Sequence, residues 1–166
     1  MRYLIDSNCF IEPKNTVCPL DVATSFWSKI KSLADEGDIF ILDKVKAELS
    51  EVEDELKDWV NSNIDKNQVL KFENERSIAQ FRLVNAWALT NKQYNQNAIN
   101  KFLDSTRADI FLVSYAATLP SEWTVVSQEK SSPQKQNDIK LPDACTHFGV
   151  RCVSLMDMFR EMGETY

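Results

Sequence analysis

Three features that would point to particular protein classes are scarce or absent in this chain. No stretch of the sequence approaches the run of about 20 apolar residues that a transmembrane helix needs. The four cysteines form no Cys-x-x-Cys pair, which argues against a zinc ribbon or a disulfide framework. We therefore expect a cytoplasmic protein without a membrane partner, whose cysteines remain reduced thiols.

Histidine and net positive charge are also scarce. The only histidine, His147, is interpreted as a packed or exposed residue near a helix end, not as a general base. The formal net charge of −6 argues at first against a nucleic-acid partner, but the distribution of charge matters more than its total. The basic residues gather in three places, at Lys29 and Lys31, at Lys44 and Lys46, and at Lys130, Lys135, Lys140 and Arg151. A local basic surface is therefore compatible with the sequence.

Short apolar runs alternate with helical periodicity along the chain. Strands are expected at 2–5, 38–42, 123–127 and 150–155. Helices are expected near 21–36, 43–60, 73–103, 106–116, 142–149 and 156–162, with a loop at 12–19. Strand followed by helix, repeated, predicts an α/β fold with a mainly parallel sheet covered on both faces. The length predicts a single domain over residues 1–166.

Four acidic residues occupy positions that are not expected to face solvent. Asp6 directly follows the first strand, at the edge where open α/β sheets bind ligands. Glu129 follows the strand at 124–127 by two residues and is expected at the same edge. Asp109 lies in the middle of the apolar stripe of its expected helix, and Glu48 lies on the flank of another. A lone carboxylate buried in this way is costly, so each is a candidate site residue.

A fifth acid, Asp143, has a simpler explanation. It lies in the first turn of the helix opened by Pro142, where a negative charge complements the helix dipole. Several carboxylates at one sheet edge repel each other unless a divalent cation lies among them. Oxygen-only ligands suit Mg²⁺ or Mn²⁺, which bind phosphate oxygens and activate water. The acids therefore predict hydrolysis of phosphodiester bonds.

The acids also resemble, in order and spacing, the four acidic motifs of PIN domains. The matching segments are Ile5-Asp6-Ser7-Asn8, Val45-Lys46-Ala47-Glu48-Leu49, Ala108-Asp109-Ile110 and Val125-Val126-Ser127-Gln128-Glu129. Over nearly its whole length the chain is most similar to the PIN-type group described as a domain of unknown function, DUF4411, whose members resemble toxin nucleases of type II toxin–antitoxin modules. The resemblance implies a three-layer α/β/α fold and a Mg²⁺- or Mn²⁺-dependent ribonuclease.

The resemblance also implies roles for individual residues. Asp6, Glu48 and Asp109 match the three best-defined catalytic and metal-binding acids. PIN domains usually place Asp at the fourth position, where this chain has Glu129, so Asp143 can share or take over that metal-binding role. The residues expected to orient these carboxylates are Ser7, Asn8 and Ser127. The lysines expected to contact the RNA substrate are Lys130, Lys135 and Lys140. A cognate antitoxin is an expected partner, and a homodimer is left open.

Two alternatives come from other functional classes. The first is a catalytically inactive PIN-like module that holds a protein partner, because fold alone does not imply function. The second is a receiver-type phosphoacceptor domain, which needs an acidic pair after the first strand and a lysine after the last. Here Asp6 is followed by Ser7 and Asn8, and the last strand is followed by Met156. Binding of Mn²⁺ near Asp6 distinguishes a nuclease from an inactive module.

Overall fold

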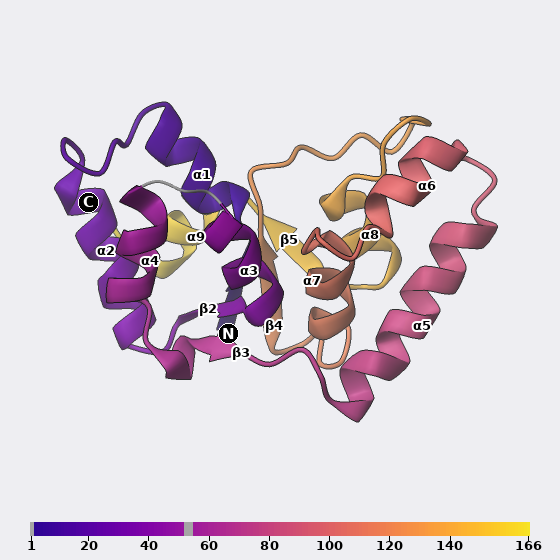
Figure 1. Cartoon of the computed structure of the whole chain (residues 1–166), viewed down its shortest axis with the longest axis horizontal. Coiled ribbons are helices and arrows are strands. Elements are labelled where there is room, and N and C mark those ends of the chain that lie inside the picture. Colours follow the sequence, from indigo (N-terminus) through magenta and orange to yellow (C-terminus); the bar gives the residue numbers. More distant parts are fainter. Residues whose placement is uncertain (1, 52–54) are drawn as a thin grey trace.

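A parallel β-sheet forms the centre of the molecule (Figure 1). The computed structural model describes residues 2–51 and 55–166. In these residues the strands pair in the order β3-β2-β1-β4-β5, and every pairing is parallel. The strands are β1 (Arg2–Ile5), β2 (Ile39–Leu42), β3 (Val69–Leu70), β4 (Trp123–Val126) and β5 (Arg151–Val153). The predicted α/β class is confirmed.

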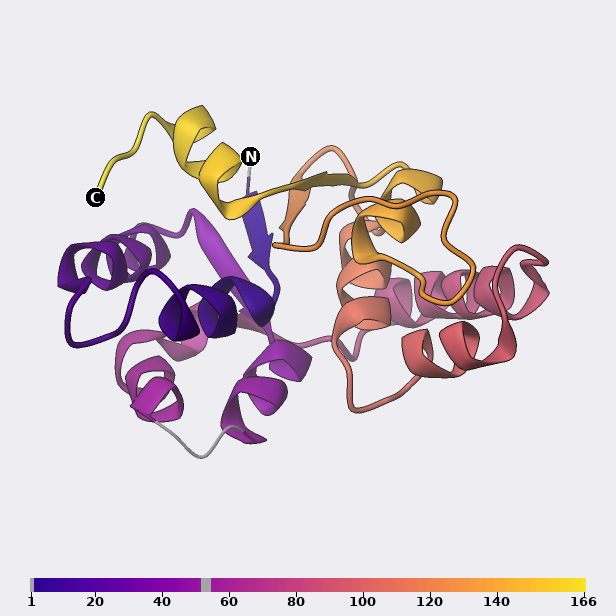
Figure 2. The same ribbon diagram turned by 90° about the horizontal axis from the view of Figure 1, so that it is seen from above.

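Helices cover both faces of this sheet, as Figures 1 and 2 show from two directions. One layer contains α1 (Asn8–Asn15), α2 (Thr24–Asp35), α3 (Asp43–Glu51), α4 (Glu55–Asn63) and α9 (Leu155–Met162). The opposite layer contains α5 (Glu75–Thr90), α6 (Gln96–Phe102), α7 (Asp109–Ala116) and α8 (Leu141–His147). A short 3-10 helix, η1 (Lys66–Gln68), leads into β3. The architecture is therefore the three-layer α/β/α arrangement that the resemblance implied.

Burial explains why the apolar runs form these elements. Leu4 and Ile5 of β1 and Val125 and Val126 of β4 are all buried, because helices cover both sides of the central strands. The predicted apolar face of α2 is buried as well and consists of Phe26, Trp27, Ile30, Leu33 and Ala34. Among the described residues, no helix is long and apolar enough to cross a lipid bilayer.

The structure corrects one predicted segment in the first layer and describes another only in part. The predicted loop at 12–19 is wrong in its first half, because α1 begins at Asn8 and continues to Asn15 with Pro13 inside it. Pro13 costs this short helix a backbone hydrogen bond, but Cys9, Phe10 and Pro13 itself are buried against the core. The single helix expected over 43–60 is described as α3 and α4, and Val52 and Asp54 lie outside the described residues.

Two more corrections fall in the second layer. The long helix expected over 73–103 is divided into α5 and α6, because the side chain of Asn95 accepts the Ala98 N–H and caps a new helix. The helix expected to begin at Thr106 begins at Asp109 instead. Asp104 accepts hydrogen bonds from both the backbone N–H and the hydroxyl of Thr106, which stabilises a turn before the helix.

The order of the strands determines where a ligand site can form. The chain passes from β1 to β2 on one side, and the later strand β4 pairs with the other side of β1. This is a topological switch point, and ligands of open α/β sheets bind beside it at the carboxyl ends of the strands. Asp6 follows β1 there, and Ser127 follows β4.

Candidate active site

Asp6 is buried at the switch point between β1 and β4. Its backbone N–H donates to the carbonyl of Val126 at 2.9 Å, and its Oδ2 accepts a hydrogen bond from Ser127 Oγ at 2.9 Å. Burial raises the pKa of Asp6 well above its ordinary value, and the negative charge of Asp109 raises it further. The Ser127 hydrogen bond lowers this pKa, whereas Glu48 and Glu129 add to the increase. The structure therefore brings these four acids into one electrostatic cluster, the acidic cluster (Asp6, Glu48, Asp109 and Glu129).

Glu48 joins the two helical layers at this cluster. Its Oε2 accepts a hydrogen bond from Ser7 Oγ at 2.6 Å, and its Oε1 accepts the backbone N–H of Ala108 at 2.9 Å. Ala108 is the N-cap of α7 and receives no cap from its own side chain, so the carboxylate on α3 caps α7 from outside. Burial raises the pKa of Glu48, although the hydrogen bonds from Ser7 and Ala108 oppose the increase.

Asp109 is the first residue of α7, three residues after the expected start of that helix. Its Oδ2 accepts two hydrogen bonds from Arg107, from Nη2 at 2.7 Å and from Nε at 3.2 Å. Burial lowers the pKa of Arg107, but Asp109, Glu48 and Glu129 together raise it above its ordinary value. Arg107 was not predicted as a site residue. The local hint in the sequence is that it precedes Asp109, an acid at the start of a helix, by two residues.

Glu129 lies at the same sheet edge and caps a second helix. Its Oε2 accepts the backbone N–H of Leu141, the first residue of α8, at 3.0 Å. Its Oε1 lies 3.6 Å from the ammonium nitrogen of Lys140. Its own N–H donates to Ser127 Oγ at 3.2 Å, so Ser127 contacts both Asp6 and Glu129.

Asn8 ties the ends of β1 and β4 together beneath this cluster. Its side-chain amide donates to Ser127 Oγ at 3.2 Å and accepts the backbone N–H of Gln128 at 3.0 Å. Ser7, Asn8 and Ser127 therefore each contact an acid of the cluster or the strand that carries it. Such contacts hold a carboxylate in one orientation.

Asp143 contacts a different part of the molecule. Its carboxylate accepts hydrogen bonds from the hydroxyl of Ser131 and from the backbone N–H of Ser132 at 3.0 Å. Its charge also raises the pKa of Tyr94, after the larger effect of burial. Asp143 thus stabilises the loop after β4, and in this structure Glu129 is the acid that contacts Ser127 and raises the pKa of Asp6.

Two of the three lysines expected to bind RNA take part in ion pairs within the chain. Asp138 lies 2.7 Å from Lys140, 3.7 Å from Lys135 and 2.8 Å from Lys101. Burial alone would raise the pKa of Asp138, but the hydrogen bonds from Lys101 and Lys140 outweigh it and lower the pKa to about 2. Lys130 is exposed. The loop from 128 to 140 is therefore anchored largely by the charges that were expected to contact substrate.

Similarity to known proteins gives the family and the fold of the chain. Residues 3–166 match the family model described as "Domain of unknown function (DUF4411)". The chain belongs to the DUF4411 family. A similar structure is that of VapBC2 from Rickettsia felis, described as "bound to a DNA fragment from their promoter". The similarity covers 93% of this chain and 98% of the matched VapBC2 chain. The TM-score is 0.55 and the sequence identity is 14%, so the similarity shows the fold alone, which is PIN-like. No curated protein matches the chain.

Cys9, Cys145 and the histidine of this DUF4411 protein are poorly placed to act as nucleophile or base. Burial raises the pKa of Cys9 well above that of an ordinary thiol. The pKa of Cys145 is also raised, first by its hydrogen bond with Cys152 and then by burial. A raised pKa keeps a thiol protonated and unreactive. His147 lies at the end of α8 and stacks on Trp87, with ring centroids 4.9 Å apart. The acids are therefore the chemically distinctive groups.

The acidic cluster suits a divalent cation in its chemistry. Among the described residues, no three acidic, histidine or cysteine side chains already surround a single point as metal ligands. The carboxylate oxygens of the acidic cluster instead accept hydrogen bonds from Ser7, Ala108, Arg107, Ser127 and Leu141. The donor set consists of oxygen alone, as Mg²⁺ and Mn²⁺ prefer. Burial is the main cause of the raised pKa of Asp6, and the charges of Asp109, Glu48 and Glu129 add to it; a bound cation would favour the ionised carboxylate against all of these effects.

Proposed function

We propose that this DUF4411 protein is a Mg²⁺- or Mn²⁺-dependent ribonuclease of the cytoplasm that hydrolyses phosphodiester bonds. One observation carries the proposal. Asp6 is buried at the switch point of a parallel sheet, and three further acids from α3, α7 and the loop after β4 act on its pKa. Burying an ionised acid in that position destabilises the fold, whereas the same acid can bind a divalent cation that activates water.

Each residue of the cluster has an assigned part in this proposal. Asp6, Glu48, Asp109 and Glu129 would hold the cation, which supplies an activated water and neutralises charge on the phosphate when it is bound. Ser127 orients Asp6, and Ser7 orients Glu48. Asp143 could join them only by leaving Ser131 and Ser132, so we assign the fourth position to Glu129.

The test is cleavage of purified total RNA by the metal-free protein before and after addition of Mn²⁺. We expect fragments only with the cation, no fragments with excess EDTA, and a higher melting temperature on Mn²⁺ addition because the ion binds the folded state. The double variant Cys9→Ser, Cys145→Ser should cleave at nearly the same rate where it folds, since no thiol takes part. Intact RNA and an unchanged melting temperature would support the inactive binding module instead.

We further propose that this ribonuclease is the toxin of a toxin–antitoxin pair. The resemblance of its motifs to toxin nucleases and the fold it shares with VapBC2 support this. A basic side chain of the antitoxin, most effectively an arginine, would bind the acidic cluster in place of metal or phosphate.

Growth in a bacterial host tests the toxin proposal separately from catalysis. Expression of the wild-type chain should slow growth, Asp6→Asn should relieve the defect, and co-expression of an adjacent open reading frame should restore growth through a complex. Normal growth despite abundant, Mn²⁺-binding protein would contradict the toxin role while leaving the ribonuclease in place.

A further inference from the structure

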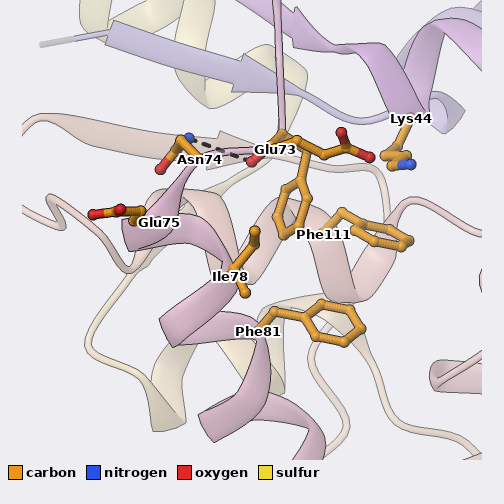
Figure 3. A pocket seen from close by; sticks show the side chains of 8 residues that line it. Lys44, Glu73, Asn74, Glu75, Ile78, Phe81 and Phe111 are labelled. Atoms are coloured by element: carbon orange, nitrogen blue, oxygen red, sulfur yellow. Dashed lines mark hydrogen bonds between the residues drawn. The ribbon is translucent and has the colours of Figure 1, made fainter.

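Two neighbouring hollows lie beside α3, and neither is lined by a residue of the loop that was expected to bind RNA. The first, drawn in Figure 3, has a volume of about 500 Å³ and is lined by Lys44, three phenylalanines and the start of α5. The second has a volume of about 440 Å³ and is lined by Lys46, Lys66 and Lys71 with Asp43. The two are adjacent in the chain, because Lys44 follows Asp43 and Phe72 follows Lys71. We call the lysines of both hollows and the three phenylalanines the α3 strip (Lys44, Lys46, Lys66, Lys71, Phe72, Phe81 and Phe111).

The first hollow combines an apolar wall of three phenylalanines and Ile78 with the polar side chains of Lys44, Glu73, Asn74 and Glu75. Phe111 packs edge-on against Phe72 at 4.9 Å and stacks with Phe81 at 5.4 Å between ring centroids. The ammonium of Lys44 lies 5.1 Å from the centroid of the Phe111 ring. Ile78 of α5 also lines the hollow and is 40% exposed. Such a hollow accepts a flat, neutral, largely apolar group.

The second hollow concentrates positive charge that no ion pair of the described residues neutralises. Across residues 2–51 and 55–166, Lys46, Lys66 and Lys71 take part in no ion pair, whereas Lys101, Lys135 and Lys140 all contact Asp138. Asp43 is the acid that shares this hollow, and its Oδ1 accepts the backbone N–H of Phe72 at 3.3 Å. Three lysines around one hollow, without an ion pair in the part of the chain that the structure describes, favour a ligand with several negative charges.

The α3 strip begins beside the acidic cluster. Lys44 precedes Glu48 by one turn of α3, a rise of about 6 Å. Phe111 follows Asp109 by two residues on α7. The strip and the acidic cluster therefore share the helices α3 and α7.

We propose that the α3 strip binds single-stranded RNA next to the scissile phosphate. The apolar hollow takes one base, and Lys46, Lys66 and Lys71 contact the adjoining phosphates. The proposal rests on the ribonuclease function proposed above and names the surface that holds its substrate. Alternating apolar and lysine-lined surfaces match the alternating bases and phosphates of an unpaired strand, whereas the bases of a duplex are stacked inside it. Glu73 and Glu75 lie at the hollow assigned to the uncharged base, away from the hollow assigned to phosphate.

Binding of a fluorescein-labelled 12-nucleotide oligouridylate to the full-length chain in EDTA tests the strip without cleavage. The variant is Lys46→Ala, Lys71→Ala, and the matched control is Lys57→Ala, Lys92→Ala, which also removes one half-buried and one exposed lysine. We expect the first pair to weaken binding about tenfold and to reduce the salt slope by about 1.4, at 0.7 for each lost contact on a single strand. The control pair should stay within about twofold, because its lysines lie outside the strip.

A second comparison tests the base-binding hollow. Ile78→Ser should weaken binding of the oligouridylate but leave binding of an abasic oligomer of equal length unchanged. Leu83→Ser is the control, because Leu83 is an exposed residue of the same helix at 56% exposure and does not line the hollow. Equal loss for both oligomers would overturn the assignment of a base to this hollow.

The outcomes separate this proposal from the ribonuclease itself. If both lysine pairs weaken RNA binding equally, or neither does, the α3 strip is not the RNA surface, even where Mn²⁺-dependent cleavage is intact. If only Lys46→Ala, Lys71→Ala weakens RNA binding while the wild type leaves RNA uncut with Mn²⁺, the strip stands and the ribonuclease proposal fails. Loss of antitoxin binding with unchanged RNA binding would assign the strip to the protein partner and overturn the proposal.

Discussion

Asp6→Asn is expected to lower Mn²⁺-dependent RNA cleavage by at least about a hundredfold, the scale on which charge stabilisation of a transition state is lost. The same substitution should raise the melting temperature of the metal-free protein. Burial and then Asp109 are the main causes of the raised pKa of Asp6, so its negative charge opposes folding near neutral pH. The amide of Asn is neutral, has the same shape, and can still accept the Ser127 hydrogen bond.

The pH dependence of stability gives a separate measurement of the same effect. Because the folded-state pKa of Asp6 lies above 3.8, its contribution to stability is full below that pH and is lost as pH rises through the folded-state pKa. The melting temperature of the metal-free wild type should therefore rise as pH falls from neutral toward the ordinary pKa of an aspartate, and that of Asp6→Asn should rise less. Each 1 kcal/mol corresponds to about 2–4 °C for a chain of this size.

Asp58→Asn is the matched control for Asp6→Asn, because Asp58 is an exposed aspartate on α4. It should leave both cleavage and the pH profile of the melting temperature unchanged. An Asp6→Asn protein that is inactive and also less stable across this pH range would show that Asp6 serves the fold more than the chemistry. Differential scanning fluorimetry and an RNA gel assay on the same preparations decide between the two.

Arg107→Ala is expected to tighten Mn²⁺ binding by about tenfold, equivalent to about 1.4 kcal/mol, and to destabilise the metal-free protein. The guanidinium contacts Asp109 at 2.7 Å and also interacts with Glu48 and Glu129. It therefore competes with a cation for carboxylate oxygens and repels it by charge. Without Arg107 the metal-free acids lose their counter-ion, and their mutual repulsion is fully expressed.

Isothermal titration with Mn²⁺ measures this effect, and Arg82→Ala is its control. Arg82 is an exposed arginine on α5, so its loss changes the net charge equally without touching the acidic cluster. Arg107→Lys should bind Mn²⁺ with intermediate affinity, because lysine keeps the charge but loses the two-pronged hydrogen bond to Asp109. Equal Mn²⁺ affinity in Arg107→Ala and Arg82→Ala would show that Arg107 does not oppose metal binding.

Local patterns in the sequence were enough to determine the strands and helices whose buried residues form a regular pattern within one segment. The apolar runs that form β1, β2 and β4, and the buried face of α2, follow from residues within one segment. The position of Asp6 at the end of β1 follows in the same way. A sequence of alternating strands and helices also determined the α/β class, because parallel strands need crossover helices.

Tertiary structure decided the contacts between residues that are far apart in the chain. Glu48 caps α7 across 60 residues, and Lys101 contacts Asp138 across 37. No periodicity indicates either contact, so the partner of Glu48 could not be predicted, nor could the ion pairs of Lys135 and Lys140. The two-residue strand β3 and the continuation of α1 through Pro13 likewise depend on what packs against them. The acids were visible in the sequence, whereas their partners were decided by which surfaces the folded chain brings together.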